Sequence, residues 1–264
     1  MCTLALYFQV FPHYPLVVAA NRDEALARPS AAPVQLWPAP WVYGGQDLLA
    51  GGTWLGINES SVVAGILNRH TPSPPDPHRR SRGLLCLDAL TYPSATAALQ
   101  FVTAQPARQY NPFNLLVADP SDAYVIHPLN DTLQVHRLTP GVHLLTNLDL
   151  NDPECPRIAR SFQHFLRVGQ ELSTTATSLS DLFAQLHPIL ADHDTPLDPR
   201  TQDPRNSLCV HLAGYGTCSS TLLAYSSSEQ RYTYRFAPGP PCQTSYTEVP
   251  VPPATLASHP PSTM

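Results

Sequence analysis

The sequence predicts an α+β fold in which packed β-sheets are covered by helices. Apolar segments that alternate or run continuously, as strands do, occur in three blocks along the chain. Two blocks with helical spacing separate them, whereas a doubly wound α/β fold would alternate single strands with single helices. The chain has 264 residues and is therefore long enough to bury a large core.

The first block of strands begins at the N-terminus. Residues 2–9 and 16–20 are apolar or alternating, and the FPHYP between them is typical of a turn, so we expect a hairpin. Residues 28–40 form a proline-rich connection. Two further strands, TWLGI and SVVAGILN, come after it.

The rest of the chain continues this order. Helical spacing over 83–105, interrupted at Pro93, is followed by strands in FNLLVAD, AYVIHP, TLQVHRL and GVHLLTN. Helices are predicted over 156–168 and 179–190, before strands in SLCVHL, SSTLLAYS and YTYRFAP. We expect one domain over residues 1–238 and a disordered tail over 239–264, because this tail is rich in proline, serine and threonine.

Charge and hydropathy exclude several classes of protein. The net charge is −5 and the longest run of arginines is the pair at 79–80, so we expect no nucleic-acid partner. The sequence has neither a run of apolar residues long enough to span a bilayer nor a secretory leader, which predicts a cytoplasmic protein without a membrane span. The oligomeric state is left open.

The six cysteines and eleven histidines are dispersed along the chain. They form neither a CxxC pair nor an HExxH motif, and His78, His127, His136 and His143 lie in loop-like or strand-like contexts. Their spacing therefore predicts reduced thiols, no metal site and no resident cofactor.

The chain opens MCT, which places Cys2 directly after the initiator methionine. Removal of Met1 would leave Cys2 with a thiol and a free α-amine, whose ordinary pKa values of about 8.5 and about 7.7–8.0 make them a nucleophile and its base. The alternative is that Cys2 packs as a small hydrophobic residue.

A polar run, NRDE at residues 21–24, comes at the expected end of the second strand. A hairpin brings the end of its second strand beside the start of the first, so these side chains should lie near Cys2. A carboxylate or amide there could tune the pKa of the thiol and of the amine. The alternative is a solvated loop with an Asx turn.

Several motifs together carry a family resemblance. MCT, AANRDE with RPS behind it, GGTWLGI, YNPFNLLVAD, LTPGVHLLTN and AGYGTCSSTLL, in this order over residues 1–225, resemble the NRDE family of transport and Golgi organization protein 2 homologues. That family is similar to N-terminal nucleophile hydrolases of the choloylglycine hydrolase type. The resemblance implies a four-layer αββα sandwich with two stacked antiparallel sheets.

The resemblance also implies roles for individual residues. Cys2 would be the nucleophile, Asp23 would orient its amine, and Asn68 and Asn147 would bind the oxyanion. The residues expected to contact the substrate are Asn21, Arg22 and Trp54.

Two positions depart from the pattern of the resembled proteins. The hydrolases have an arginine three residues before the aspartate, where this chain has Ala20. Arg22 should point to the face opposite Asp23, since neighbouring residues in a strand alternate. In YGTCSST, Cys218 stands where the family usually has an arginine, so a cation is missing at that position.

Two functions remain from the sequence. The first is a hydrolase or acyltransferase that acts on a linear amide C–N bond through a Cys2 thioester, with an apolar or acyl-amide small molecule as ligand. The alternative is a non-catalytic protein that binds or carries haem or lipid. The chain has no CxxCH motif for covalent haem attachment.

Overall fold

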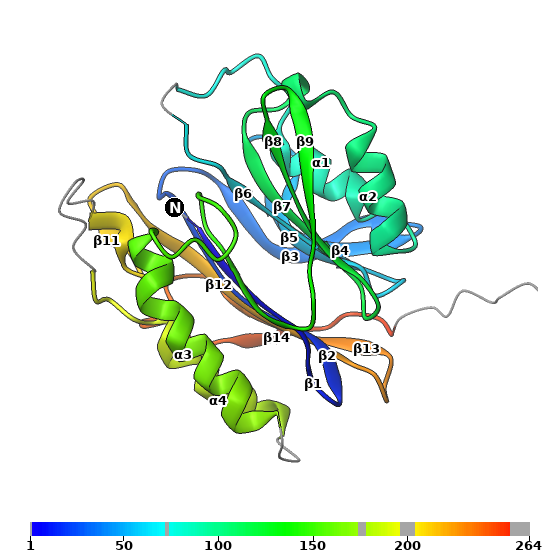
Figure 1. The fold of residues 1–264 in the computed structure, drawn as a ribbon. Coiled ribbons are helices and arrows are strands. Elements are labelled where there is room, and N and C mark those ends of the chain that lie inside the picture. Colours follow the sequence, from blue (N-terminus) through cyan, green and yellow to red (C-terminus); the bar gives the residue numbers. More distant parts are fainter. Residues whose placement is uncertain (1, 72–73, 174–177, 196–203, 254–264) are drawn as a thin grey trace, which may run out of the picture.

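Two antiparallel sheets are stacked face to face, with a pair of helices on each outer side (Figure 1). The computed structural model describes residues 2–71, 74–173, 178–195 and 204–253, and within them each sheet has seven strands. These four layers confirm the predicted αββα sandwich.

The first sheet is built around the N-terminal hairpin, as predicted. Its second strand continues through Ala25, because it pairs with one strand on each side. The expectation that NRDE follows the strand is therefore wrong, since residues 21–24 lie within it. The strand order is β10 (Gly141–Leu145), β1 (Thr3–Phe11), β2 (Tyr14–Ala25), β12 (Tyr215–Ser226), β13 (Arg231–Ala237) and β14 (Thr247–Val249), with β11 (His211–Leu212) pairing with β12.

The second sheet follows the chain order of its strands. It consists of β3 (Ser30–Pro38), β4 (Trp41–Asp47), β5 (Thr53–Asn58), β6 (Val63–Asn68), β7 (Phe113–Ala118), β8 (Ala123–Leu129) and β9 (Thr132–Arg137).

Its edge strand β3 corrects the prediction of an irregular proline-rich connection. Proline is compatible with an edge strand because no second neighbour needs its missing N–H. Pro33 also lies where the register between β3 and β4 shifts, between Ala31 and Val34.

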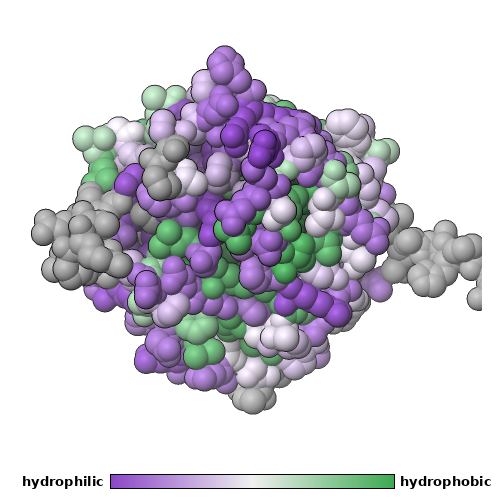
Figure 2. Space-filling view, turned by 45° about the horizontal axis from the view of Figure 1, so that its top comes forward, coloured by the Kyte–Doolittle hydropathy of each residue, from purple (hydrophilic) through white to green (hydrophobic). Residues whose placement is uncertain are grey.

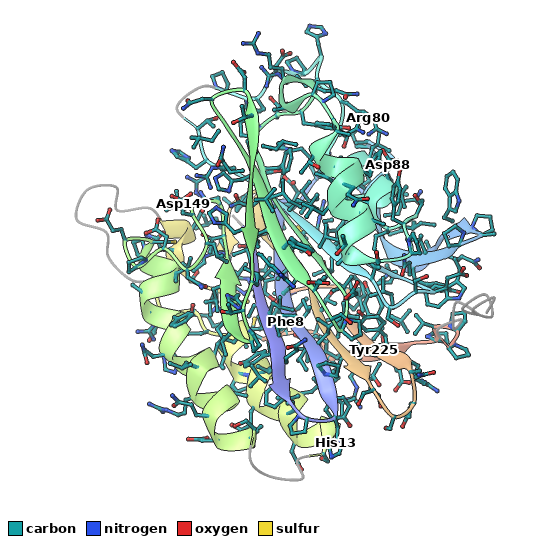
Figure 3. The ribbon with its side chains drawn as sticks, turned by 45° about the vertical axis from the view of Figure 1, so that its right-hand side comes forward. Phe8, His13, Arg80, Asp88, Asp149 and Tyr225 are labelled. Atoms are coloured by element: carbon teal, nitrogen blue, oxygen red, sulfur yellow. The ribbon has the colours of Figure 1, made fainter. Side chains whose placement is uncertain are left out.

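The helices lie where their apolar spacing predicts. Helices α1 (Arg82–Ala89) and α2 (Ala95–Thr103) cover the second sheet, and α3 (Pro156–Leu172) and α4 (Leu179–Leu190) cover the first (Figure 1). Pro93 separates α1 from α2, and the Ser94 hydroxyl then caps α2 by accepting a hydrogen bond from the Ala97 N–H at 3.1 Å. An ion pair of 2.7 Å joins Arg80, two residues before α1, to Asp88 near the end of this helix (Figure 3).

The central strands are buried on both faces. In β1, Phe8 packs into the core between the sheets, as Tyr225 of β12 does (Figure 3), while Tyr7 packs against the helices. This alternation with a period of two decides which side chains can meet between the sheets and which can meet a helix.

The chain beyond Pro238 differs from the predicted disordered tail. Strand β14 pairs with β13, and Tyr246 and Ser220 share a hydrogen bond of 2.5 Å between their hydroxyls. Residues 254–264 lie outside the described residues. Of the strand expected in SLCVHL, only residues 211–212 are a strand.

The surface shown in Figure 2 is largely hydrophilic, with hydrophobic side chains gathered near the middle of that face. Within the part of the chain that the structure describes, no helix is long and apolar enough to cross a bilayer.

Candidate functional site

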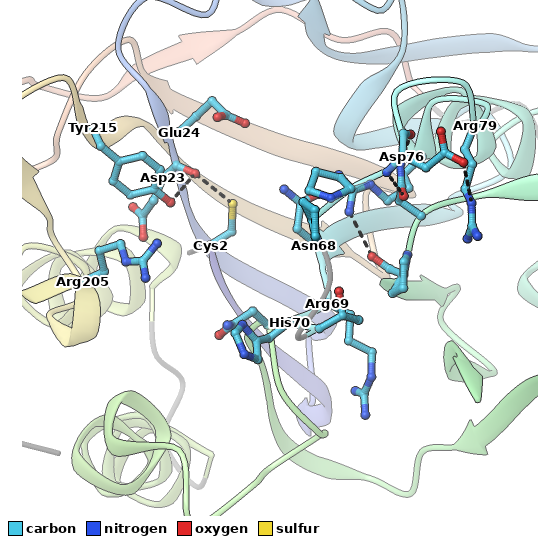
Figure 4. A pocket seen from close by; sticks show the side chains of 17 residues that line it. Cys2, Asp23, Glu24, Asn68, Arg69, His70, Asp76, Arg79, Arg205 and Tyr215 are labelled. Atoms are coloured by element: carbon cyan, nitrogen blue, oxygen red, sulfur yellow. Dashed lines mark hydrogen bonds and ion pairs between the residues drawn. The ribbon is translucent and has the colours of Figure 1, made fainter. Parts of the chain in front are cut away.

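The half-buried Cys2 precedes β1 and opens onto a cavity of about 640 Å³ (Figure 4). The cavity lies where the ends of strands from both sheets meet, with β1 and β2 on one side and β6 on the other. The structure brings all four residues that the resemblance implied for catalysis to its wall. These residues are Cys2, Asp23, Asn68 and Asn147.

The Asp23 side chain is held by a buried ion pair that the sequence did not predict. One carboxylate oxygen lies 2.9 Å from Nη1 of Arg157 in α3, and both side chains are fully buried. The other oxygen accepts a hydrogen bond of 2.7 Å from the Thr217 hydroxyl. Arg157 Nη1 also donates to the Thr3 hydroxyl at 2.7 Å, so one guanidinium connects α3 with both β1 and β2.

Cys2 contacts the main chain of Asp23. Its Sγ lies 3.5 Å from the Asp23 carbonyl oxygen, which also accepts a hydrogen bond of 3.2 Å from the Tyr215 hydroxyl (Figure 4). Burial raises the pKa of the Cys2 thiol, while the positive charge of Arg22 acts in the opposite direction. The thiol therefore needs a base to become a nucleophile at neutral pH.

Arg22 lies on the face of β2 opposite Asp23, as alternation predicts. Its guanidinium stacks over the ring of Trp54 with 4.5 Å between Cζ and the ring centroid, and its Nη1 is buried with no hydrogen-bond partner among the described residues. Trp54 can lie this close to β4 because residue 45 is glycine: a Cβ there would come within 2.2 Å of the ring. Cys2, Arg22 and Trp54 line a small second pocket.

Asn21, which the sequence predicts to contact the substrate, also lines the small second pocket, and its polar atoms are bound within the protein. Its side-chain amide donates hydrogen bonds to the carbonyls of Leu190 at 2.8 Å and Leu208 at 2.9 Å, and its oxygen accepts one of 2.6 Å from the Ser220 hydroxyl. Asn21 is buried, and these bonds connect β2 to the end of α4. The side chain therefore links β2 to the helical layer, and its predicted contact with the substrate stays a prediction.

The two other asparagines come from different sheets. Asn68 is the last residue of β6 and is exposed, and Asn147 lies two residues beyond β10. Asn147 Oδ1 is buried without a hydrogen-bond partner in the described part of the chain. A hydrogen bond of 2.7 Å from the His70 N–H to the Asn147 carbonyl joins the two loops.

The cavity wall carries several arginines that the sequence did not single out, together with the carboxylates of Glu24 and Asp76. Arg69 forms an ion pair with Asp149, and Arg79 lies 3.6 Å from a carboxylate oxygen of Asp76. Arg82, at the start of α1, donates to the Pro112 carbonyl at 3.0 Å and has no carboxylate within 4.0 Å among the described residues.

Arg157 and Arg82 could not be found from local sequence. Arg157 follows a proline at a helix start, as many surface arginines do. Its burial depends on how α3 packs on the sheet, which the local sequence does not show. Cys218, at the position of the missing family arginine, is half-buried with its Sγ 3.5 Å from the Glu24 carbonyl. Among the described residues, no three metal-ligating side chains converge at this cavity.

The two stacked antiparallel sheets with helices on both outer sides have the αββα arrangement of the N-terminal nucleophile hydrolase fold. A penicillin V acylase from Agrobacterium tumefaciens superposes with a TM-score of 0.56 at 13% identity, covering 90% of this chain and 83% of the acylase. The Caenorhabditis elegans ortholog of N-acylethanolamine-hydrolyzing acid amidase gives a TM-score of 0.53 at 13% identity, covering 84% and 92%. These likenesses concern the fold alone.

The chain belongs to the Transport and Golgi organisation 2 family, which matches residues 1–235. It is 28% identical over 246 residues to the Transport and Golgi organization 2 homolog of Mus musculus, covering 84% of this chain and 88% of the relative. The Homo sapiens homolog gives the same identity and coverage. The predicted family resemblance is confirmed.

Proposed function

We propose that this chain is an N-terminal cysteine hydrolase or acyltransferase that cleaves a linear amide bond. The observation that carries the proposal is that Cys2, Asp23, Asn68 and Asn147, far apart in sequence, line one cavity in a fold shared with amide hydrolases. A cytoplasmic setting suits it, because the thiol must stay reduced.

The proposed reaction requires that Met1 is removed. The α-amine of Cys2 then takes the thiol proton, and the thiolate forms a C–S bond with the substrate carbonyl carbon. The oxyanion accepts hydrogen bonds from the side-chain amides of Asn68 and Asn147. As the C–N bond breaks, the ammonium returns its proton to the departing nitrogen. Water, or an acceptor amine, then cleaves the thioester.

In this proposal Asp23 is a positioning residue. Its carboxylate is bound to Arg157 and Thr217, so its effect on Cys2 acts through the strand end that this ion pair fixes and through the carbonyl that contacts the thiol. After removal of Met1, the free α-amine would belong to Cys2, the residue whose thiol contacts the Asp23 carbonyl.

The substrate class that fits the wall is an N-acyl amino acid or a similar amide with an anionic group. Arg82 lines the same cavity as Cys2 and lacks a carboxylate partner in the described part of the chain, so it can bind a substrate carboxylate. Partial burial lowers the pKa of the Arg82 guanidinium and the Glu24 carboxylate offsets this only in part, so an anionic ligand would favour the charged form.

Turnover by protein confirmed by mass spectrometry to lack Met1 tests the proposal. N-acyl amino acids and uncharged N-acyl amides of the same chain length are incubated with wild type and with Cys2→Ala. We expect the wild type to release the free amine and to favour the anionic substrates. Cys2→Ala should show no turnover.

A matched control is Cys86→Ala, which removes a buried thiol of helix α1. This variant should keep its turnover. The haem or lipid carrier remains the alternative, and it makes the opposite prediction: both wild type and Cys2→Ala would bind haem or lipid in the micromolar range, and neither would consume any amide. That result would overturn the proposal.

A further inference from the structure

Four side chains able to bind a metal converge beside β11, near the C-terminal end of α4. They are His193, three residues after α4; Cys209, two residues before β11; His211, the first residue of β11; and Cys242, in the turn after β13. One ligand atom from each lies within 4.8 Å of all the others. The dispersed sequence positions, from which we expect no metal site, do not reveal this cluster because it is assembled from three separate segments.

The spacing of three of these atoms fits a tetrahedral metal. Cys209 Sγ lies 3.6 Å from Cys242 Sγ and 3.5 Å from His211 Nε2, and His211 Nε2 lies 3.2 Å from Cys242 Sγ. With Zn–S of about 2.3 Å and Zn–N of about 2.0–2.1 Å, tetrahedral angles separate two sulfurs by about 3.8 Å and a sulfur from a nitrogen by about 3.6 Å. The three observed separations lie within a few tenths of an ångström of these values.

The fourth ligand, His193, is oriented by the main chain. Its Nδ1 is 3.2 Å from the Cys209 carbonyl oxygen, which can only accept, so Nδ1 carries the proton and Nε2 carries the lone pair. A backbone carbonyl that fixes the tautomer in this way is the usual outer partner of a metal-bound histidine. The rings of His193 and His211 lie side by side, with their centroids 5.0 Å apart.

We propose that His193, Cys209, His211 and Cys242 bind one zinc ion as a closed, structural Cys2His2 site. Two thiolates and two imidazoles in a tetrahedral arrangement favour zinc, and four protein ligands leave no position open for a substrate. Hydrogen bonds between thiols are weak, so they give little reason for two sulfurs and a ring nitrogen to lie in mutual contact.

The site would add to hydrogen bonds that already join these segments: the Cys209 N–H donates to the Asp192 carbonyl at 2.8 Å, and His187 Nε2 lies 2.9 Å from the Pro241 carbonyl oxygen. It joins the end of α4 and the turn after β13 to the segment before β11. That segment also supports the cavity described above: the Val210 N–H donates to the Thr217 hydroxyl at 2.9 Å, and Thr217 donates to Asp23.

Metal content of the full chain tests the proposal. The protein is produced with zinc in the medium, purified anaerobically without chelator and analysed by mass spectrometry for bound metals. We expect about one zinc ion per chain. Cobalt exchanged into the site should give the visible absorption of tetrahedral cobalt together with thiolate-to-cobalt charge transfer.

The variants Cys242→Ser and His211→Ala should lose most of the zinc and the thiolate–cobalt band. Both residues are exposed, so these changes leave the core intact. His164→Ala, which removes an exposed histidine of α3, is the matched control and should retain the zinc.

Three results would overturn the proposal. One is wild type that retains less than about one tenth of an equivalent of zinc after reconstitution and gel filtration. Another is a Cys242→Ser variant that binds as much zinc as the wild type. The third is a disulfide between Cys209 and Cys242 in freshly isolated protein, found by peptide mapping after alkylation.

Discussion

At the scale of single residues, the side of a strand on which a side chain lies decides its role. Asn21 and Asp23 point from β2 to the helices, where other residues bind their polar atoms. Arg22 points between the sheets, where it stacks on Trp54 near Cys2. Neighbouring members of one motif therefore have different functions.

The sequence predicted the neighbourhood of Cys2 better than its contacts. Asp23, Asn68 and Asn147 could be placed near Cys2 through the family resemblance, and they share its cavity. Arg82 and Arg157 could not, because nothing in their local sequence separates an arginine that faces a cavity or the core at a helix start from an exposed one.

The protonation of Cys2 gives a test at this scale. Burial raises its thiol pKa, so thiolate is scarce at neutral pH and alkylation by iodoacetamide should increase with pH with a midpoint above that of N-acetylcysteine. Removal of Met1 brings an ammonium group onto Cys2 itself, and this charge should lower the midpoint. Peptide mapping across a pH series, on chains with and without Met1, measures both midpoints. Identical midpoints would argue against the amine as the base.

At the scale of elements, the helical layers are attached to the sheets by buried polar side chains as well as by apolar packing. Asn58, at the end of β5, donates to the carbonyls of Leu90 at 2.7 Å and Tyr92 at 2.8 Å after α1. Asn21 does the same for the end of α4, and Arg157 ties α3 to β2. Each attachment satisfies backbone or charged groups that would otherwise be buried unpaired.

Helices with clear spacing were predictable from sequence, whereas a proline-rich edge strand and one short alternating segment were not. Helix α4 begins and ends where its spacing places it, at residues 179 and 190. Strand β3 was missed because its prolines suggest a loop, and only its position at the sheet edge makes them tolerable. SLCVHL alternates like a strand, yet the Leu208 carbonyl accepts from the Asn21 side chain and the Ser207 hydroxyl donates to the Cys209 carbonyl, and only residues 211–212 pair with β12.

The ion pair between α3 and β2 can be tested by unfolding. Arg157→Met leaves the Asp23 carboxylate buried without its cation and should lower the free energy of unfolding by about 3–5 kcal/mol. The double variant Asp23→Asn, Arg157→Met should regain part of this loss, because no unpaired charge remains. Urea titrations measure both.

Arg137→Gln is the control for this prediction, because it breaks an ion pair with Asp122 in which the arginine side chain is 73% exposed. It should cost less than about 1 kcal/mol. A cost for Arg157→Met no larger than that of the control would mean that the buried pair does not hold α3 to the sheet.

At the scale of the whole molecule, both candidate sites depend on segments that are distant in the chain. The cavity at Cys2 needs loops from both sheets, and the proposed zinc site needs the ends of α4 and β13. Residues 239–253 belong to this assembly, since β14 extends the first sheet and Val249 and Val251 pack against the core between the sheets.

A chain that ends at Pro238 should therefore be less stable than one that ends at residue 253. It loses the partly buried ring of Tyr246, the hydrogen bond of this tyrosine with Ser220 and the pairing of β14. We expect the loss to be roughly 3 kcal/mol from ring burial and hydrogen bonding together. Urea unfolding of both chains with chelator present measures this difference, because the chelator removes any contribution of metal bound through Cys242. Equal midpoints would place the end of the folded domain at residue 238 and assign no stability to the strand that follows.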